Sequence, residues 1–213
     1  MTKLSFSPRK LYEGCLQAAI THAVAVGLYP EFNYEHSWDE LSYSTNNSQG
    51  CRGTITFHEK YIIAAFRDDQ IGNSPSDAMV FFKDAPEELI QLAQTETLLY
   101  LLLNVDGEVK PVITAAFWGT WEQLYTHQSV TDLCEDGGYI IGNALQTYED
   151  AANEWRDYYE LDDAQIALID SLFQRKLHAG NQPVYLTEKD LEVLYGDVNE
   201  CLVSLGELGI RLP

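Results

Sequence analysis

Hydrophobic and polar residues follow two different periods along this 213-residue chain. Near the N-terminus, apolar side chains recur every three or four residues between Leu11 and Val26, after a Ser7-Pro8 pair and before Gly27. That spacing, with a capping serine and a proline at the first helical position, predicts an α-helix. Residues 41–67 instead alternate with period two, as in Thr54-Ile-Thr-Phe57. We predict a three-stranded antiparallel meander there.

The middle of the chain predicts short elements separated by turns. Gln70 to Asp77 contains glycine, asparagine, serine and proline and is expected to be a loop. Met79–Phe82 fits either a strand or one helical turn. Pro86-Glu87-Glu88 should open a short helix, because acidic side chains in a first turn are stabilised by the helix dipole.

A hairpin is the clearest local prediction. The runs Leu98–Asn104 and Val109–Phe117 read as strands on either side of Asp106-Gly107, a favoured two-residue turn. Pro111 lacks an amide donor, so we expect it at a strand edge or at a position without a ladder bond.

The C-terminal third reads as helical. Three approximate capping boxes mark helix starts, at Thr147/Asp150, Asp162/Gln165 and Thr187/Asp190. The second precedes an apolar stripe from Ile166 to Leu177, and the third precedes one from Leu191 to Leu205, with Gly206 as the C-cap. Ser129 with Asp132 predicts a further short helix that Gly137-Gly138 stops.

These elements predict an α+β fold: an antiparallel sheet of about five or six strands packed against an N-terminal helix and a C-terminal helical layer. We expect a single domain over residues 1–213, sheet-rich over 1–145 and helical over 146–213. No parallel βαβ series is apparent.

The chain is strongly acidic. It has 33 Asp and Glu against 13 Lys and Arg, a net charge of −20. Between Asp84 and Glu154 thirteen acids accompany only Lys110, which places −12 in one third of the chain. Because 46% of the residues are hydrophobic, the acidity belongs to a folded surface rather than to disorder. Such a field repels nucleic acid and anionic membranes and favours a basic protein partner.

The four cysteines at positions 15, 51, 134 and 201 show no CxxC or zinc spacing. The N-terminus lacks the apolar stretch of a signal peptide, and no run reaches the roughly 18 apolar residues of a membrane helix. We therefore expect a cytoplasmic protein with reduced, buried or idle thiols.

Candidate chemistry is sparse. Glu35, His36, Asp39 and Glu40 could ligate a divalent ion, but their spacing matches neither an EF-hand nor a zinc site. No GxSxG elbow or phosphate-binding loop is present, and Cys51 has no histidine fixed beside it by sequence. Adjacent acids such as Asp68-Asp69 are more often solvated than catalytic. We predict no catalytic residue, no metal site and no cofactor.

Aromatic side chains next to acids offer a better candidate. Interfaces favour Trp and Tyr anchors, so an acidic surface around such residues would suit a basic partner. The binding residues that we predict are Tyr34, His36, Trp38, Asp39, Glu40, Asp68, Asp69, Trp118 and Trp121.

The run from Trp38 through Asn46-Asn47-Ser48 to Gly53-Thr-Ile-Thr-Phe57, the Ala115-Ala-Phe-Trp-Gly119 segment and the Asp136-Gly-Gly138 turn resemble bacterial immunity proteins of polymorphic toxin systems. The resemblance covers about the first two thirds of the chain and carries over no site residue. It implies a cytosolic α+β protein that neutralises a toxin without catalysis or cofactor. We thus favour a non-catalytic protein that binds a basic partner. The alternative is an enzyme of small-molecule metabolism with an incidentally acidic surface; a mimic of DNA is a variant of the first hypothesis.

Overall fold

The computed structural model describes residues 1–72 and 77–213. It divides into two compact units, each made of two chain segments. The first unit comprises 1–12 and 41–142, and the second comprises 13–40 and 143–213. Helix α1 (Pro8–Ala25) begins in the first unit and continues into the second.

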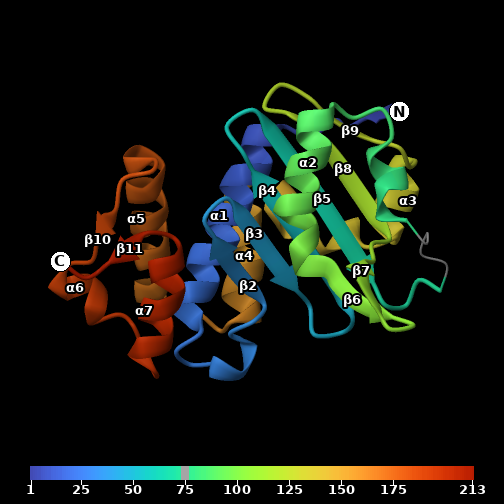
Figure 1. The fold of residues 1–213 in the computed structure, drawn as a ribbon. Coiled ribbons are helices and arrows are strands. Elements are labelled where there is room, and N and C mark those ends of the chain that lie inside the picture. The colour runs from blue at the N-terminus through green and yellow to red at the C-terminus, as the bar shows by residue number, and fades with distance from the viewer. Residues whose placement is uncertain (73–76) are drawn as a thin grey trace. The chain divides into compact units, whose positions relative to one another are not determined.

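The first unit is a sheet with short helices on both sides (Figure 1). Its strands are β1 (Thr2–Lys3), β3 (Ser42–Asn46), β4 (Cys51–Phe57), β5 (Tyr61–Asp68), β6 (Leu102–Val105), β7 (Glu108–Pro111), β8 (Ala115–Thr120) and β9 (Leu124–Thr126). Its helical segments are η2 (Ala78–Phe82), α2 (Glu87–Thr95), η3 (Thr97–Leu101), α3 (Val130–Glu135) and η4 (Gly138–Ile141), where η marks a 3-10 helix.

Among the described residues the large antiparallel sheet has seven strands, six of them in the first unit in the order β1-β9-β8-β5-β4-β3. The meander β3-β4-β5 confirms the prediction for residues 41–67. Strand β5 then pairs with β8, and β9 and β1 extend the sheet at that edge. The α+β class and the large antiparallel sheet are therefore confirmed.

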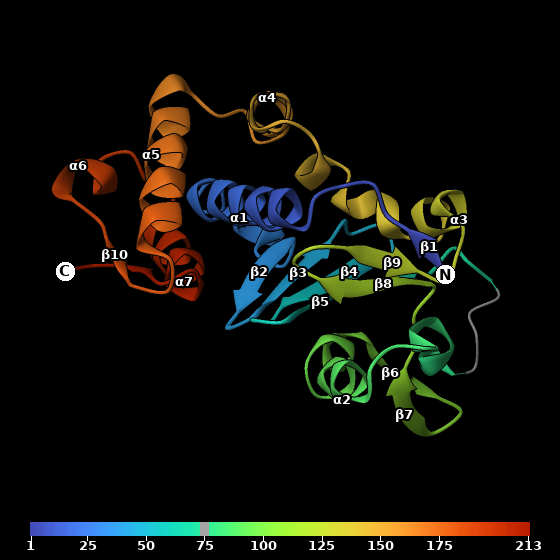
Figure 2. The same ribbon diagram turned by 90° about the horizontal axis from the view of Figure 1, so that it is seen from above.

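Alternate side chains of the central strands cover the two faces of this sheet. Ile63, Ala65 and Trp118 belong to a buried cluster with residues of η2, α2 and η3. On the other face, the Phe66 and Phe117 rings pack 5.8 Å apart, and the segment from α3 to η4 lies on that side (Figure 2). The start of α1 reaches the same sheet through Tyr12, whose ring lies 5.2 Å from that of Phe57.

The Asp106-Gly107 turn joins β6 to β7 as predicted, but the strands are shorter than the apolar runs. Residues 97–101 form the 3-10 helix η3 rather than strand, because that turn buries Thr97, Leu98 and Leu101 together. The second run is interrupted at Val112–Thr114, between β7 and β8. Pro111 ends β7 in a two-stranded sheet, consistent with the expected strand edge.

The neighbouring short elements follow the sequence closely. Met79–Phe82 takes the helical alternative, within η2. Pro86 precedes α2, and Ser129 caps α3 by accepting from the Asp132 amide. In the predicted loop at Gln70–Asp77, positions 73–76 lie outside the described residues.

The second unit is mainly helical. Besides residues 13–25 of α1, it holds η1 (Pro30–Phe32), β2 (His36–Asp39), η5 (Asn143–Leu145), α4 (Tyr148–Tyr158), α5 (Asp163–Ala179), β10 (Val184–Tyr185), α6 (Glu188–Leu191), α7 (Val198–Glu207) and β11 (Ile210–Arg211). Helix α5 contacts β10, and α7 contacts β11 and β2.

All three predicted caps start helices, and the Asp162 and Thr187 boxes are reciprocal. The single C-terminal helix expected behind Thr187 is wrong. Helix α6 ends at Leu191, and α7 starts anew after its N-cap Asp197 and runs past Gly206 to Glu207. Strands β10 and β11, which flank these helices, pair in parallel, a crossover that the sequence did not indicate.

Two glycines explain the break. Gly196 adopts φ +72°, and a Cβ there would lie 2.0 Å from the carbonyl oxygen of Gly27. Conversely, a Cβ on Gly27 would lie 2.3 Å from the carbonyl oxygen of Tyr195. The Asp197 amide donates to the Gly27 carbonyl at 2.7 Å. The chain beyond α1 and the loop before α7 thus touch backbone to backbone, which side chains at either position would prevent.

The single domain expected over residues 1–213 stays a prediction, as does its division into a sheet-rich and a helical part. Residues 13–40 group with residues 143–213 in the second unit.

Candidate binding site

A buried carboxylate organises one end of the second unit. Glu35, between η1 and β2, is only 4% exposed. Its Oε1 accepts a hydrogen bond from the Tyr158 hydroxyl at 2.8 Å and its Oε2 one from the Tyr159 hydroxyl at 3.0 Å. Burial and the Glu35 carboxylate raise the pKa of Tyr158 to about 12. The Tyr158 phenol therefore stays protonated, and both hydroxyls donate to the Glu35 carboxylate.

Two histidines lie beside this pair of tyrosines. His22 on α1 is buried, and its Nε2 lies 2.9 Å from the carbonyl oxygen of Phe32. Because a carbonyl only accepts, that nitrogen carries the proton. The His36 ring lies 5.4 Å from the His22 ring. Burial lowers the pKa of His22, and burial together with the His22 charge lowers that of His36 well below its usual value. Both lowered pKa values favour the neutral imidazoles at neutral pH.

Aromatic stacking fixes the end of α4 over these groups. Trp155 stacks on Tyr159 at 5.9 Å between ring centroids and meets His36 edge-on at 5.3 Å. Tyr158 contacts Tyr159 edge-to-face at 4.7 Å. Although its hydroxyl is held by Glu35, Tyr158 remains 56% exposed. One large aromatic ring is thus presented on the surface in a fixed position.

Carboxylates surround that ring along α4. The segment from Thr147 to Asp163 contains seven Asp and Glu and one basic residue, Arg156, and all seven acids are exposed. Arg156 is already paired with Asp163. Glu154 lies one helical turn before Tyr158, so both occupy one side of α4. We call Glu154, Asp157 and Tyr158, with the neighbouring Tyr34, the α4 face.

The predicted binding residues between positions 34 and 40 differ in exposure: some are at the surface and others are buried. Tyr34 is 49% exposed and raises the pKa of Tyr158, which places the two phenols near each other. His36 is buried as described above. Trp38 is buried too; its amide donates to Glu207 at 2.9 Å and its indole to the Glu40 carbonyl at 3.2 Å. Asp39, the last residue of β2, and Glu40, which follows it, are exposed.

The four possible metal ligands in that stretch point to different environments. Glu35 is engaged by two tyrosines and His36 by aromatic rings, whereas Asp39 and Glu40 are at the surface. Within residues 1–72 and 77–213, no group of three or more His, Cys, Asp or Glu side chains is placed to hold a metal ion.

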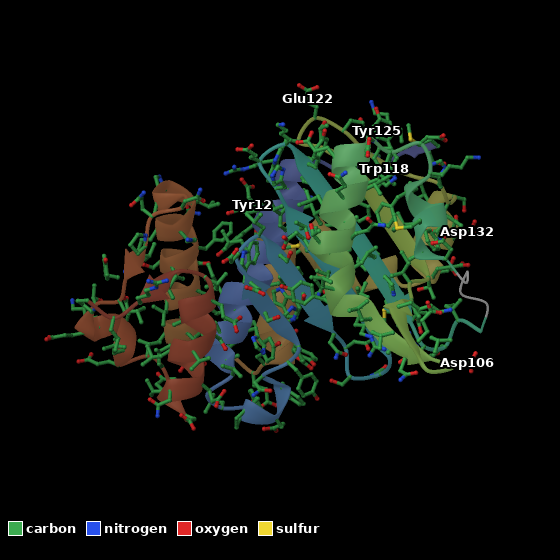
Figure 3. All side chains as sticks on the ribbon, viewed as in Figure 1. Tyr12, Asp106, Trp118, Glu122, Tyr125 and Asp132 are labelled. Carbon is green, nitrogen blue, oxygen red and sulfur yellow. The ribbon has the colours of Figure 1, made fainter. Side chains whose placement is uncertain are left out.

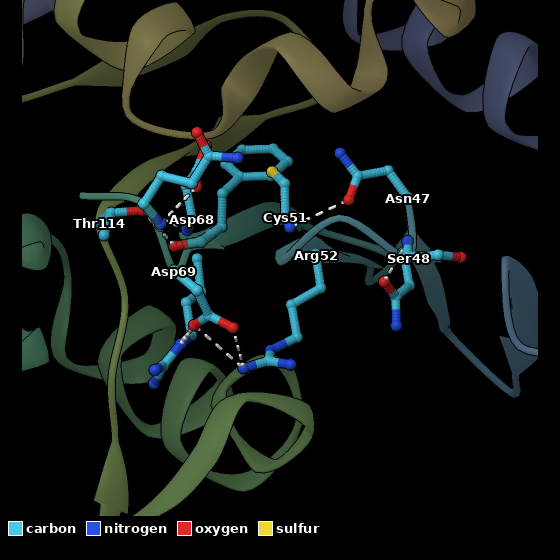
Figure 4. Close-up of polar contacts among 11 residues, drawn as sticks. Asn47, Ser48, Cys51, Arg52, Asp68, Asp69 and Thr114 are labelled. Atoms are coloured by element: carbon cyan, nitrogen blue, oxygen red, sulfur yellow. Dashed lines mark hydrogen bonds and ion pairs between the residues drawn. The ribbon is translucent and has the colours of Figure 1, made fainter.

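The predicted acids Asp68 and Asp69 belong to a separate polar network in the first unit (Figure 4). Asp68 is 5% exposed and accepts from the Tyr139 hydroxyl at 3.1 Å and the Gln70 amide at 2.8 Å. Asp69 is exposed and pairs with Arg52, at 3.4 Å, and with Arg67. Each carboxylate already has partners within the chain, so the network fastens the ends of β4 and β5.

Cys51 sits in the same network, with its thiol 3.5 Å from the Gly137 carbonyl oxygen. Burial raises its pKa to about 11, with smaller increases from the Asp68 and Asp69 charges, while the hydrogen bond with Tyr139 and the Arg52 charge oppose this rise. The thiol is therefore protonated and a poor nucleophile. All four cysteines are free; Cys134 is exposed and the other three are buried.

The two tryptophans expected to act together face different environments. Trp118 is 5% exposed in the cluster beneath α2, and its indole donates to the Phe81 carbonyl at 3.3 Å (Figure 3). Trp121 is half-buried. Its indole N–H donates to the His58 carbonyl oxygen at 2.9 Å, and its ring centroid lies 5.9 Å from that of Tyr12. Trp118 is a core residue by position, and Trp121 is the more accessible of the two.

Four residues of this region were not predicted from the sequence: Tyr158, Tyr159, Trp155 and His22. The Thr147/Asp150 cap predicted the start of α4, but no pattern linked the end of that helix to Glu35, which lies 123 residues before Tyr158. The acidic signal was visible, since the acids continue beyond Glu154 to Asp163.

Comparisons with known proteins gave no match: no family model, no curated protein and no solved structure is significantly similar to this chain. No helix within the described residues is long and apolar enough to cross a membrane.

Proposed function

We propose that this protein is a non-catalytic binding protein that neutralises a basic protein partner, as a bacterial immunity protein neutralises a toxin, in the cytoplasm. The observation that carries the proposal is the α4 face, where the exposed Tyr34 and Tyr158 occur together with the exposed acids Glu154 and Asp157. The second unit holds nineteen Asp and Glu against five Lys and Arg, a net −14, whereas the first unit carries fourteen against eight, a net −6. The second unit is therefore the stronger attractant for a cation-rich surface.

The chemistry of the α4 face suits recognition of Lys and Arg. A guanidinium can stack on an exposed tyrosine ring while pairing with a carboxylate beside it. Tyr158 is well prepared for this role because Glu35 and Tyr159 restrict its ring before binding, which lowers the entropic cost of association. The surrounding acids would accelerate encounter and select against acidic partners.

The same groups offer little support for the enzyme alternative. His22 and His36 are buried with lowered pKa values, and the tyrosine hydroxyls are committed to Glu35. A general acid or base has to reach substrate. No arrangement in the described residues favours a particular reaction.

The proposal is tested by titrating the purified protein with basic toxin domains encoded in its own genome, at low salt. The Glu154→Gln/Asp157→Asn double variant should weaken binding. Glu188→Gln/Glu192→Gln is the matched control, because it removes the same charge from exposed positions elsewhere in the second unit. The proposal fails if none of the basic domains binds, or if both double variants weaken binding equally.

A further inference from the structure

A second surface lies in the first unit, at η3 and the β6–β7 hairpin. It exposes several large apolar side chains. In η3, Leu98 and Leu101 are fully buried, whereas Leu99 between them is 53% exposed. Leu102, at the start of β6, is 39% exposed, and Val109 on β7 is 65% exposed. We call Leu99, Leu102 and Val109 the hairpin patch.

The register of the hairpin places these side chains together. Leu102 pairs with Pro111 and Asn104 with Val109. Leu102 and Val109 are therefore diagonal neighbours on one face, within reach of each other. Leu99 precedes Leu102 by one 3-10 turn, which brings it to the same end of the hairpin. Grouped exposed apolar residues mark interaction sites more often than isolated ones do.

The hairpin patch is attached to the hydrophobic core of the first unit. The Val112 amide donates to the Leu101 carbonyl at 3.0 Å, and Leu98 and Leu101 are anchored in the cluster beneath α2. The two-stranded sheet itself is a separate sheet from the large one and lies on the same side of it as α2 (Figure 2). An isolated hairpin is marginally stable, so its attachment through η3 makes it a presented surface and not a loose loop.

Acids border the patch. Asp106 lies at the tip of the hairpin (Figure 3), and Glu96 precedes η3. Glu108 follows on β7, but strand alternation places it on the face opposite Val109. Between Glu96 and Val112, Lys110 is the one basic residue, and it is half-buried. An apolar centre with a negative rim complements a segment that is apolar on one side and basic on the other.

We propose that the hairpin patch docks an amphipathic basic segment of a partner protein. The apolar side of the segment covers Leu99, Leu102 and Val109, and its Lys and Arg side chains meet Glu96 and Asp106. A second copy of this chain is a poor occupant, because a symmetric contact would bring the acidic rim against itself. The proposal rests on the proposed function in sharing its class of partner, a basic protein, but it concerns a different unit and different residues.

The probe is a synthetic amphipathic peptide of about eighteen residues with leucines on one helical face and lysines on the other. A peptide of the same composition with scrambled order is the control ligand. The Leu102→Thr/Val109→Thr variant should raise the Kd of the amphipathic peptide roughly tenfold. Val130→Thr is the matched control, because Val130 is also exposed, at 55%, but lies on α3 across the large sheet. Circular dichroism and urea midpoints verify that each variant is folded.

Amide chemical shifts of the wild-type protein should move at Leu102 and Val109 on addition of the peptide. The proposal is overturned if the peptide does not bind, if the scrambled peptide binds equally well, or if the hairpin variant binds as the wild type does. It is also overturned if Leu102→Thr/Val109→Thr instead abolishes self-association of the protein. Loss of peptide binding in Glu154→Gln/Asp157→Asn alone would support the α4 face and reject the hairpin patch, so the two proposals fail separately.

Discussion

Tyr159 donates its hydroxyl to Glu35 from a fully buried position, at 3.0 Å. The two residues lie 124 positions apart in the sequence, and their bond joins the end of α4 to the segment before β2. A buried carboxylate is costly unless it is hydrogen-bonded, so this bond and its partner from Tyr158 hold the α4 face in place.

Removal of the buried donor should therefore destabilise the protein more than removal of the exposed one. We expect Tyr159→Phe to lower the free energy of unfolding by about 1–3 kcal/mol, because it leaves a buried carboxylate oxygen without its donor. Tyr158→Phe should cost less, since water can replace the hydroxyl of a residue that is 56% exposed. Urea unfolding of both variants measures the difference. Equal costs, or a larger cost for Tyr158→Phe, would contradict the assigned roles.

The buried histidines predict a pH dependence. Their pKa values are lowered in the folded protein, so the unfolded chain binds protons that the folded chain does not. Their stabilising contribution is complete above the unfolded histidine pKa of about 6.5 and is lost as the pH falls from there toward the lowered folded values. Unfolding free energy should thus decrease between pH 7.5 and 5.5, values that bracket about 6.5.

Glu207 and Asp136, whose pKa values burial raises, act in the opposite direction at lower pH. To isolate the effect of the histidines, the free energy of unfolding is measured against pH for the wild type and for His36→Phe, and the two slopes are compared. We expect a shallower slope in the variant, whatever its absolute stability. An unchanged slope would show that His36 does not resist protonation in the folded state.

Cysteine reactivity should follow exposure and pKa. Cys134 is exposed, whereas Cys51 is buried with its pKa raised to about 11. Brief alkylation with iodoacetamide near pH 8 should label Cys134 first and leave Cys51 unmodified until urea unfolds the chain. Mass spectrometry of the proteolytic peptides measures the extent of alkylation at each cysteine. Equal labelling of the two in the native protein is the contrary result.

The contact between Gly27 and Gly196 predicts a specific glycine requirement. Gly196→Ala should destabilise the protein strongly, because its Cβ would meet the Gly27 carbonyl oxygen at 2.0 Å. Gly180→Ala is the control: φ is also positive, +57°, but no atom lies within 4 Å of the added Cβ. It should cost only the strain of that backbone conformation, φ +57° with ψ −118°, about 1–3 kcal/mol. If the two variants unfold at the same urea concentration, the close approach is not what limits this position.

Local features of the fold were largely predictable from the sequence. The Ser7-Pro8 start, the Asp106-Gly107 turn and the caps at Ser129, Thr147 and Asp162 act through neighbouring residues, so their signals are local. The failures have tertiary causes. Leu98–Leu101 is as apolar as a strand, but η3 buries three of its residues against the cluster beneath α2. The break before α7 depends on Gly196 meeting Gly27, a contact between distant segments.

The candidate site could be predicted from the sequence only in part. Tyr34 and His36 were selected because aromatic and acidic residues cluster there, and both lie at or beside the Glu35 group. Their partners on α4 carry no motif, because hydrogen bonds to a buried carboxylate leave no fixed spacing. Trp118 illustrates the converse, since this tryptophan, selected as a possible interface anchor, is buried in the core.

The most direct test of the central claim is the salt dependence of binding to a basic toxin domain from the same genome. If the α4 face recruits its partner through charge, the Kd should rise steeply between about 50 and 300 mM NaCl, as screening shortens the range of the field. Glu154→Gln/Asp157→Asn should weaken binding at low salt and flatten that dependence, whereas Glu188→Gln/Glu192→Gln should do neither. A Kd that is independent of salt, or that is unchanged in the α4 variant, would contradict the account.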